Sequence, residues 1–279
     1  MTMTCSLGEV MIAALARTIE DGTLVFHGFG SPLIQLAMHV AKRTHAPRMV
    51  LVAGATYGID PDPPFLTPTT NDWVMDRGAS SALDIEELFD LAAGGRVGRM
   101  FLSGLQIDRW GNCNVTALGY PEIKMKLPGG GGGGNLSCDV AHITLWTTAH
   151  RAQEDAKGRR RFRLVEECDF ITNLGHRTSD GKPRRDLGHH GHGPQWLVTE
   201  LGVFDFDEDG HMRLKALYPD TSVEDILKNT RFKPSLASEI EIIPPPDESV
   251  VEFIRRLDPL KVHEKELSAE DIRRRFSIA

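Results

Sequence analysis

Two glycine-rich segments and one amide-rich turn contain the residues best suited to chemistry. Gly28 and Gly30 follow an apolar run, Thr23 to His27, and precede Pro32. Glycines at a strand-to-helix turn expose backbone N–H groups, which can bind a phosphate or an oxyanion at the start of the helix. The motif is weak by itself, because no third glycine completes the GxGxxG pattern and a tight turn needs glycine in any case.

The second candidate is the polar turn from Gln106 to Asn114. The side-chain amides of Gln106 and Asn112 can orient a substrate carbonyl, or they can satisfy the backbone of the turn itself. Taken singly, each amide is more typical of the structural role.

The third candidate is a run of six glycines, Gly129 to Gly134, with Lys124 and Lys126 shortly before it. The backbone amides of Gly129 and Gly130, together with the two lysines, form a pattern that can hold phosphate oxygens. The simpler interpretation of the run is a flexible linker.

A denser basic run, Arg159, Arg160, Arg161 and Arg163, is an alternative phosphate site. We expect Glu166, Glu167 and Asp169, which follow it, to neutralise it, so the two lysines are the better candidates. His189, His190 and His192 suggest a metal, but no carboxylate or thiolate is spaced to complete a zinc site. The sequence therefore predicts no metal centre.

Composition limits the possible partners. Lys and Arg total 32 against 39 Asp and Glu, a net charge of -7, which argues against a broad nucleic-acid-binding surface, so any polyanion must be held locally. The start lacks the basic and apolar order of a signal peptide, and no apolar run is long enough to span a bilayer. The four scattered cysteines suggest no disulfide framework. We expect a cytoplasmic protein with no membrane partner.

The elements that position these residues alternate between helix and strand. A helix is predicted from Leu7 to Gly22, a strand over 23–27, a helix from Pro32, a strand over 49–53, a helix over 83–92 and a strand over 99–105. Further strands are predicted over 141–146, 162–165, 170–172, 196–199 and 203–206, and helix starts at Ser222 and Ser268. This order predicts an α/β fold with an open, mostly parallel sheet flanked by helices, a domain over residues 1–243 and a tail of short helices over 244–279.

The order of these motifs resembles the β subunit of class I coenzyme A transferases, particularly the glutaconate type. The matching segments are Gly28-Phe29-Gly30-Ser31-Pro32, the strand and turn ending at Gly58, Phe101 to Asn114, the loop from Leu127, and Val198 to Phe204, which together span roughly residues 5 to 232. The resemblance implies a homologous α subunit as partner and coenzyme A as part of the substrate, with no other cofactor.

The resemblance also implies where the reaction takes place. In these transferases a glutamate in the turn after the second strand attacks the acyl thioester. That position is Gly54 here, and no Asp or Glu occurs between Met49 and Ile59. The chain is therefore most similar to the β subunit of the IpdAB-type hydrolase, which opens the last steroid ring of a coenzyme A thioester. In that α2β2 enzyme, a glutamate of the α subunit activates water.

The candidate catalytic positions are thus Gly54, Tyr57, Gln106 and Asn112, and the candidate substrate-binding positions are Gly28, Gly30, Lys124, Lys126, Gly129 and Gly130. Tyr57 is the only ionisable side chain of the turn, either an oxyanion donor or an aromatic wall for the substrate. If Gly54 faces an open cleft, Gly54→Glu leaves folding intact. The alternatives are a genuine transferase subunit and a non-catalytic scaffold; a dinucleotide-binding oxidoreductase is disfavoured by the missing GxGxxG.

Overall fold

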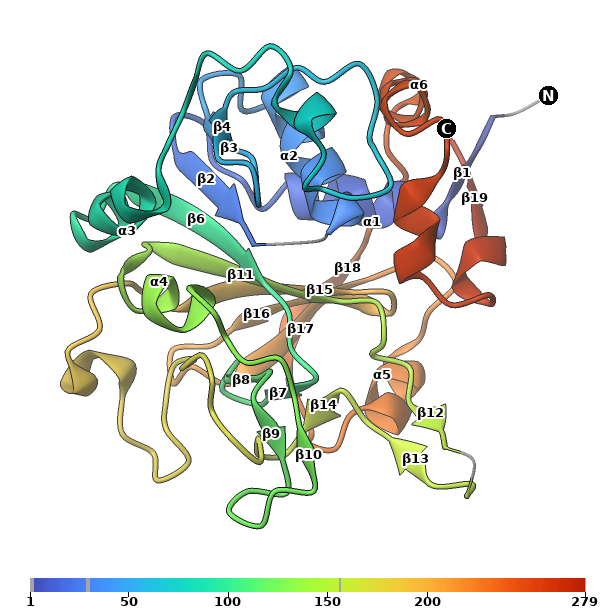
Figure 1. Cartoon of the computed structure of the whole chain (residues 1–279). Coiled ribbons are helices and arrows are strands. Elements are labelled where there is room, and N and C mark those ends of the chain that lie inside the picture. Colours follow the sequence, from blue (N-terminus) through green and yellow to red (C-terminus); the bar gives the residue numbers. More distant parts are fainter. Residues whose placement is uncertain (1–2, 29–30, 156, 279) are drawn as a thin grey trace. The chain divides into compact units, whose positions relative to one another are not determined.

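The computed structural model describes residues 3–28, 31–155 and 157–278 (Figure 1). The chain divides into two compact units. Unit 1 comprises Met1–Phe101 and Ile243–Ala279, and unit 2 comprises Leu102–Ile242. Within the described ranges, no helix is long and apolar enough to cross a membrane.

Unit 1 contains a sheet in the order β6-β2-β3-β4-β5 and the helices that cover it. Its strands are β1 (Thr4–Ser6), β2 (Leu24–His27), β3 (Val50–Val52), β4 (Gly58–Ile59), β5 (Ser81–Ala82) and β6 (Val97–Leu102), and its first helices are α1 (Leu7–Ala16), α2 (Pro32–Arg43), the 3₁₀ helix η1 (Trp73–Asp76) and α3 (Ile85–Ala93). Strand β2 pairs in parallel with both β3 and β6. The carboxyl ends of these strands therefore point to one edge, where open α/β sheets place their ligands.

Local signals explain where the first two helices begin. Ser6 caps α1 by accepting a hydrogen bond from the backbone N–H of Glu9, while the Glu9 carboxylate accepts one from Ser6. Ser31 caps α2, and Pro32 occupies its first turn. Helix α1 ends at Ala16, earlier than the predicted end at Gly22, because the chain leaves the helix in tight turns in which Thr18 hydrogen-bonds the Leu15 carbonyl.

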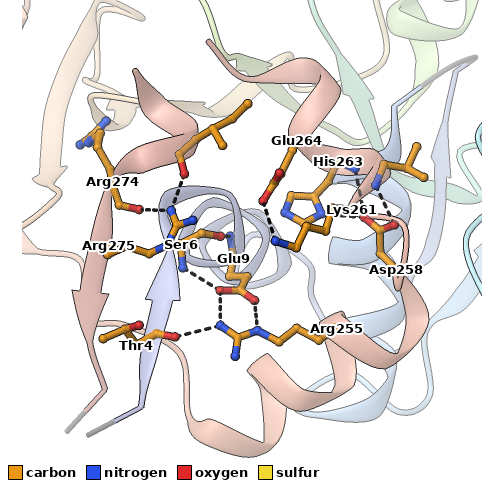
Figure 2. Close-up of polar contacts among 12 residues, drawn as sticks. Thr4, Ser6, Glu9, Arg255, Asp258, Lys261, His263, Glu264, Arg274 and Arg275 are labelled. Atoms are coloured by element: carbon orange, nitrogen blue, oxygen red, sulfur yellow. Dashed lines mark hydrogen bonds and ion pairs between the residues drawn. The ribbon is translucent and has the colours of Figure 1, made fainter. Parts of the chain in front are cut away.

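The C-terminal segment, expected to be a tail, is packed within unit 1. It forms α6 (Glu248–Leu257), η3 (Val262–Glu266), η4 (Asp271–Arg273) and β19 (Arg275–Ser277), and β19 pairs antiparallel with β1. Figure 2 shows Arg255 of α6 reaching both the Glu9 carboxylate, at 2.6 Å, and the Thr4 carbonyl, at 2.8 Å. The C-terminal segment thus packs against the start of the chain through an ion pair and backbone hydrogen bonds.

Unit 2 contains a sheet in the order β18-β17-β16-β15-β11 and a smaller sheet, β14-β7-β8. The strands are β7 (Gln106–Asp108), β8 (Cys113–Asn114), β9 (Ala117–Leu118), β10 (Met125–Lys126), β11 (His142–Thr147), β12 (Gln153–Glu154), β13 (Arg160–Arg161), β14 (Leu164–Val165), β15 (Pro194–Thr199), β16 (Gly202–Phe206), β17 (Met212–Leu217) and β18 (Ser235–Ile242). The helices are α4 (Gly133–Asp139), η2 (Arg184–Leu187) and α5 (Val223–Asn229). Strand β11 pairs in parallel with β15, and β17 with β18, whereas β16 is antiparallel to both neighbours.

The predicted α/β class with a mainly parallel sheet is confirmed, and most predicted strands are present with slightly different ends. The strand predicted over residues 170–172 is wrong. Thr172 donates its backbone N–H to the Cys113 carbonyl, and its hydroxyl forms hydrogen bonds with the backbone N–H of Val115 and the hydroxyl of Thr116. In place of a strand, the neighbouring Asn173 forms an isolated bridge with Cys113. Side-chain hydrogen bonds of this kind compete with a regular strand ladder.

Candidate functional site

In unit 1, the turn between β3 and β4 is held in one conformation by its own backbone. The N–H of Ala53 donates to the Gly58 carbonyl and that of Tyr57 to the Ala53 carbonyl, both at 2.9 Å. Ala55 and Tyr57 have positive φ angles of 71° and 61°, which residues other than glycine rarely adopt. Strain of this kind persists only where the surroundings over-determine the backbone, and it clusters at functional sites.

His27, at the end of β2, is the residue that fixes the Gly54 backbone. Its Nδ1 donates to the Gly28 carbonyl at 2.6 Å, and its Nε2 accepts the N–H of Gly54 at 3.1 Å. Burial lowers the pKa of His27 to about 4, so the ring is neutral at physiological pH. The Gly54 amide is therefore bound within the protein and is not open to a substrate oxyanion.

Gly54 does not face an open cleft, so the condition under which Gly54→Glu would leave folding intact is not met. A Cβ atom at this position would lie 2.5 Å from Cε1 of His27 and 2.6 Å from the carbonyl oxygens of both His27 and Gly28. Two of these three atoms belong to the backbone and cannot rotate away. The position at which the resemblance implies a glutamate nucleophile therefore has no room for any side chain.

Tyr57 extends the same turn as an aromatic surface. Its ring stacks on Phe26 of β2 with centroids 6.3 Å apart and planes 7° from parallel, and it is half-buried. Burial raises the pKa of the phenol, so it stays protonated at neutral pH. This geometry favours the aromatic wall over an acid–base role.

Two further candidates of unit 1 lie on the glycine turn after β2. At Gly28, an added Cβ would meet no heavy atom within 4 Å, so this backbone borders open space. Gly30 lies outside the described residues.

In unit 2, the side-chain amides of Asn112 and Gln106 form hydrogen bonds within the protein. Asn112 is fully buried; its Nδ2 donates to the Asp108 carboxylate and the Arg177 carbonyl, and its Oδ1 accepts the N–H of Gly175 at 2.6 Å. Gln106 accepts hydrogen bonds from Asn114 and from the backbone of Asp169. These contacts support the structural interpretation of both amides.

The six-glycine run is anchored at both ends. The N–H of Gly129 donates to the Val115 carbonyl, and a Cβ at Gly130 would lie 2.7 Å from the Thr172 side chain. The last two glycines begin α4, where Asn173 donates to the Gly133 carbonyl at 2.9 Å. The run is therefore a tightly placed turn and helix start rather than a flexible linker.

Most of the basic candidates line a cavity of about 660 Å³ in unit 2. Six cations line it: Lys124, Arg159, Arg160, Arg161, Arg163 and Arg231. We call it the basic cavity. Lys124 therefore has a ligand-sized space in front of it, whereas Lys126, Gly129 and Gly130 do not line this cavity.

Within the described part of the chain, two of the acids that follow the arginine run form no ion pair with it. Glu166 pairs with Arg109, and the Asp169 carboxylate accepts the backbone N–H of Gly119 at 2.6 Å. Asp155 instead pairs with Arg159 at 2.8 Å and more loosely, at 3.5 Å, with Arg161. Sequence reasoning missed Asp155, although it lies only four residues before the run.

The clustered histidines lie near the end of α4. His190 contacts Asp139 through Nδ1 at 3.1 Å, and the His192 ring lies 5.1 Å from that of His142. Among the residues whose placement is described, no group of three His, Cys, Asp or Glu side chains is arranged to hold a metal ion.

Comparison with known proteins relates the chain to one family. A family model described as coenzyme A transferase matches residues 9–229. The chain is 32% identical to one subunit of the glutaconate CoA-transferase of Acidaminococcus fermentans, covering 90% of this chain and 92% of that protein. It is 28% identical to one subunit of the 3-oxoadipate CoA-transferase of Pseudomonas knackmussii, covering 91% and 93%.

Two further relatives are not named as transferases. The cholesterol ring-cleaving hydrolase IpdB subunit of Mycobacterium tuberculosis is 24% identical, covering 93% of this chain and 97% of that protein. The crystal structure of the decarboxylase AibA/AibB is similar with a TM-score of 0.78 at 30% identity, covering 95% of this chain and 99% of that one.

Proposed function

The chain belongs to the coenzyme A transferase family, and on that premise we propose that it is the β subunit of an enzyme built from two kinds of subunit, which acts on a coenzyme A thioester without transferring the coenzyme A. The observation that carries the proposal is the packing at Gly54, where a Cβ would lie 2.5–2.6 Å from His27 and Gly28. A carboxylate nucleophile cannot be accommodated there, and the turn contains no Asp or Glu.

The reaction that this site supports best is hydrolytic cleavage of a carbon–carbon bond in a cyclic ketone, as in steroid ring degradation. Water loses a proton to the general base and adds to the ring ketone. The adjacent C–C bond then breaks, and its electron pair forms an enolate with a neighbouring carbonyl, which takes up a proton at carbon. The new carboxylate takes its added oxygen from water. This chemistry needs a general base and hydrogen-bond donors but no protein nucleophile. The similarity to the IpdB subunit over nearly the whole chain supports this reaction class.

In this proposal the general base belongs to a homologous α subunit in an α2β2 assembly. In the proposal, this chain shapes the substrate site: Tyr57, stacked on Phe26, forms an apolar wall for the ring. The backbone of Gly28 borders open space. Neutral His27 holds the turn in place. The enzyme needs no cofactor beyond the coenzyme A of its substrate, and we place it in the cytoplasm.

A genuine transferase is the second candidate, because two relatives at 28% and 32% identity carry that name. Its nucleophile would have to lie on the partner subunit. The two candidates differ in what happens to the thioester, since a transferase exchanges the coenzyme A whereas the hydrolase leaves the thioester intact.

The test uses the chain assembled with its α subunit and a cyclic keto acyl-CoA in H₂¹⁸O. We expect one ¹⁸O in the product carboxylate, an intact thioester and no covalent adduct on this chain by intact-mass spectrometry. Exchange of labelled coenzyme A between acids, with no ring opening, would favour the transferase instead. The isolated chain should show neither activity, and turnover by it alone would contradict the assignment of the base to the partner.

A further inference from the structure

Unit 1 contains a cavity of its own beside the second half of α2. Its volume is about 470 Å³, the size of a small-molecule site, and its lining comes from α2, from the segment between β4 and β5, and from α6. Three arginines, Arg43, Arg77 and Arg256, and one carboxylate, Asp62, line it. We call this space the α2–α6 cavity.

Two of the three arginines have unused hydrogen-bonding capacity. Arg43 pairs with Asp62 at 3.0 Å. In the part of the chain that the structure describes, the guanidiniums of Arg77 and Arg256 form no hydrogen bond or ion pair. Three arginines against one carboxylate leave an excess of two positive charges. Clustered charges of one sign in a concave space attract ligands of the opposite sign.

An aromatic side chain of α6 holds two of these arginines in place. The guanidinium carbons of Arg43 and Arg256 lie 4.8 Å and 5.5 Å from the ring centroid of Phe253, within cation–π range. Arginines held in this way lose less conformational entropy when they bind an anion.

The segment after β4 forms a stiff wall of the same cavity. The backbone N–H of Asp62 donates to the Arg77 carbonyl at 2.8 Å, and the next two residues, Pro63 and Pro64, have φ angles fixed by their rings. A wall that needs little ordering on binding is preorganised for a ligand.

His39 of α2 is a buried polar side chain that lines the cavity without a partner. Its exposed fraction is 7%, and among residues 3–28, 31–155 and 157–278 its ring forms no hydrogen bond. Buried polar side chains are nearly always hydrogen-bonded. Burial lowers the pKa of His39 to about 4, so the ring is neutral at physiological pH and has one N–H to donate. A ligand in the cavity would supply the missing acceptor.

The other side chains of the lining are apolar: Pro63, Pro64, Phe253 and Leu257. A guanidinium matches a carboxylate through two parallel hydrogen bonds, and it binds phosphate equally well. Inorganic phosphate, however, has no apolar part to place against these four side chains. A carboxylate joined to a hydrocarbon group uses both the charged and the apolar parts of the lining.

We propose that the α2–α6 cavity binds a small organic carboxylate, with its charge on Arg77 and Arg256 and its hydrocarbon group against Phe253 and the two prolines. The His39 ring donates its N–H to the same ligand. The site does not depend on the proposed reaction, because His39 lies roughly 12 Å along α2 from Ser31, which follows the glycine turn.

The test is titration of the full chain, alone and assembled with its α subunit, with cyclohexanecarboxylate. Calorimetry gives the affinity, and the Cε1–H signal of His39, identified from the spectrum of His39→Gln, reports binding in this cavity rather than in the basic cavity. We expect a saturable shift of the His39 signal and an affinity that falls as salt rises. Neutral cyclohexylmethanol and inorganic phosphate should each bind at least about tenfold more weakly.

Two variants identify the residues that hold the charge. Arg77→Gln and Arg256→Gln should each weaken binding of cyclohexanecarboxylate about tenfold, because each removes a charge-assisted hydrogen bond. Both side chains are exposed, so the variants should fold, and circular dichroism melting verifies this. Arg96→Gln is the matched control, since Arg96 is an exposed arginine of unit 1 outside the cavity and should leave binding unchanged.

Several results would overturn the proposal. One is the absence of a saturable His39 shift in both the chain and the complex, and another is equal affinity of the two cavity variants and the parent. Phosphate or the neutral alcohol binding as tightly as the carboxylate would refute the ligand class. If Arg77→Gln and Arg256→Gln change only assembly with the α subunit, the cavity is a subunit contact and the proposal fails.

Discussion

Gly54→Ala should destabilise the protein although it adds a single methyl group. The added Cβ would lie 2.5 Å from the His27 ring and 2.6 Å from two backbone carbonyl oxygens. Real Cβ atoms do not approach heavy atoms so closely, so the end of β2 or the turn must move. The hydrogen bond from the Gly54 N–H to His27, at 3.1 Å, would be strained by the same movement.

The size of the effect follows from two opposing terms. Overpacking of a filled site costs typically about 1–3 kcal/mol, and the two rigid oxygens place Gly54 toward the upper part of that range. Replacing glycine also restricts the unfolded chain, which returns about 0.4–1 kcal/mol. We expect a net loss of about 2 kcal/mol in the free energy of unfolding, or a melting temperature lower by about 4–8 °C.

The assay is urea unfolding of the parent and two variants followed by circular dichroism. Gly28→Ala is the matched control, because it lies beside the same turn and its Cβ would meet nothing within 4 Å. We expect it to change stability by less than about 1 kcal/mol. If Gly54→Ala were as stable as Gly28→Ala, the packing argument would be refuted, and with it the structural reason for the absent nucleophile.

Three further outcomes follow from the structure. Tyr57→Phe should change single-turnover ring opening by no more than a few-fold, because the ring stays stacked on Phe26; a loss of about 100-fold would instead identify the hydroxyl as an oxyanion donor. Burial raises the pKa of Glu266 from 4.5 to about 7. The folded state therefore favours the neutral carboxyl. The contribution of this carboxyl to the free energy of unfolding is complete below about pH 4.5 and is lost as the pH rises through 7. The Glu266→Gln side chain stays neutral, so this variant should become more stable relative to the parent as the pH rises from 5 to 8 in denaturant titrations. If the difference between the two free energies of unfolding were the same at pH 5 and pH 8, the reasoning would be contradicted. Arg255→Gln should cost on the order of 1–3 kcal/mol in the same assay, because the buried Glu9 carboxylate loses a cation at 2.6 Å; an unaltered midpoint would show that the pair contributes nothing.

Sequence reasoning succeeded where the signal is local. Ser31 and Pro32 mark the start of α2, and the Ser222 signature marks α5 with a complete capping box. Ser268 is a weaker case: its hydroxyl accepts the backbone N–H of Asp271, but the 3₁₀ helix there, η4, has only three residues and Glu270 is its N-cap. Capping depends on residues within one turn of each other, so the sequence alone contains the needed information.

The candidate site could be only partly predicted, because its decisive contacts join distant segments. Gly54 was recognised as the position without a carboxylate, but the side chain that fills its space, His27, belongs to the preceding strand. The arginine run was visible in the sequence, whereas Arg231, which shares Phe162 with Arg160, follows only after three further strands of the large sheet of unit 2. Pairings of this kind depend on the tertiary fold and leave no periodic signal.

The contacts around Gly54 explain physically why this position has no carboxylate. A glutamate restored there would have to displace the His27 ring and two carbonyl oxygens. Gly54→Glu alone therefore cannot create a nucleophile that points into a substrate site. The turn and the neutral His27 imidazole form one packed unit, so in the proposed reaction the proton transfer is assigned to a group outside this turn.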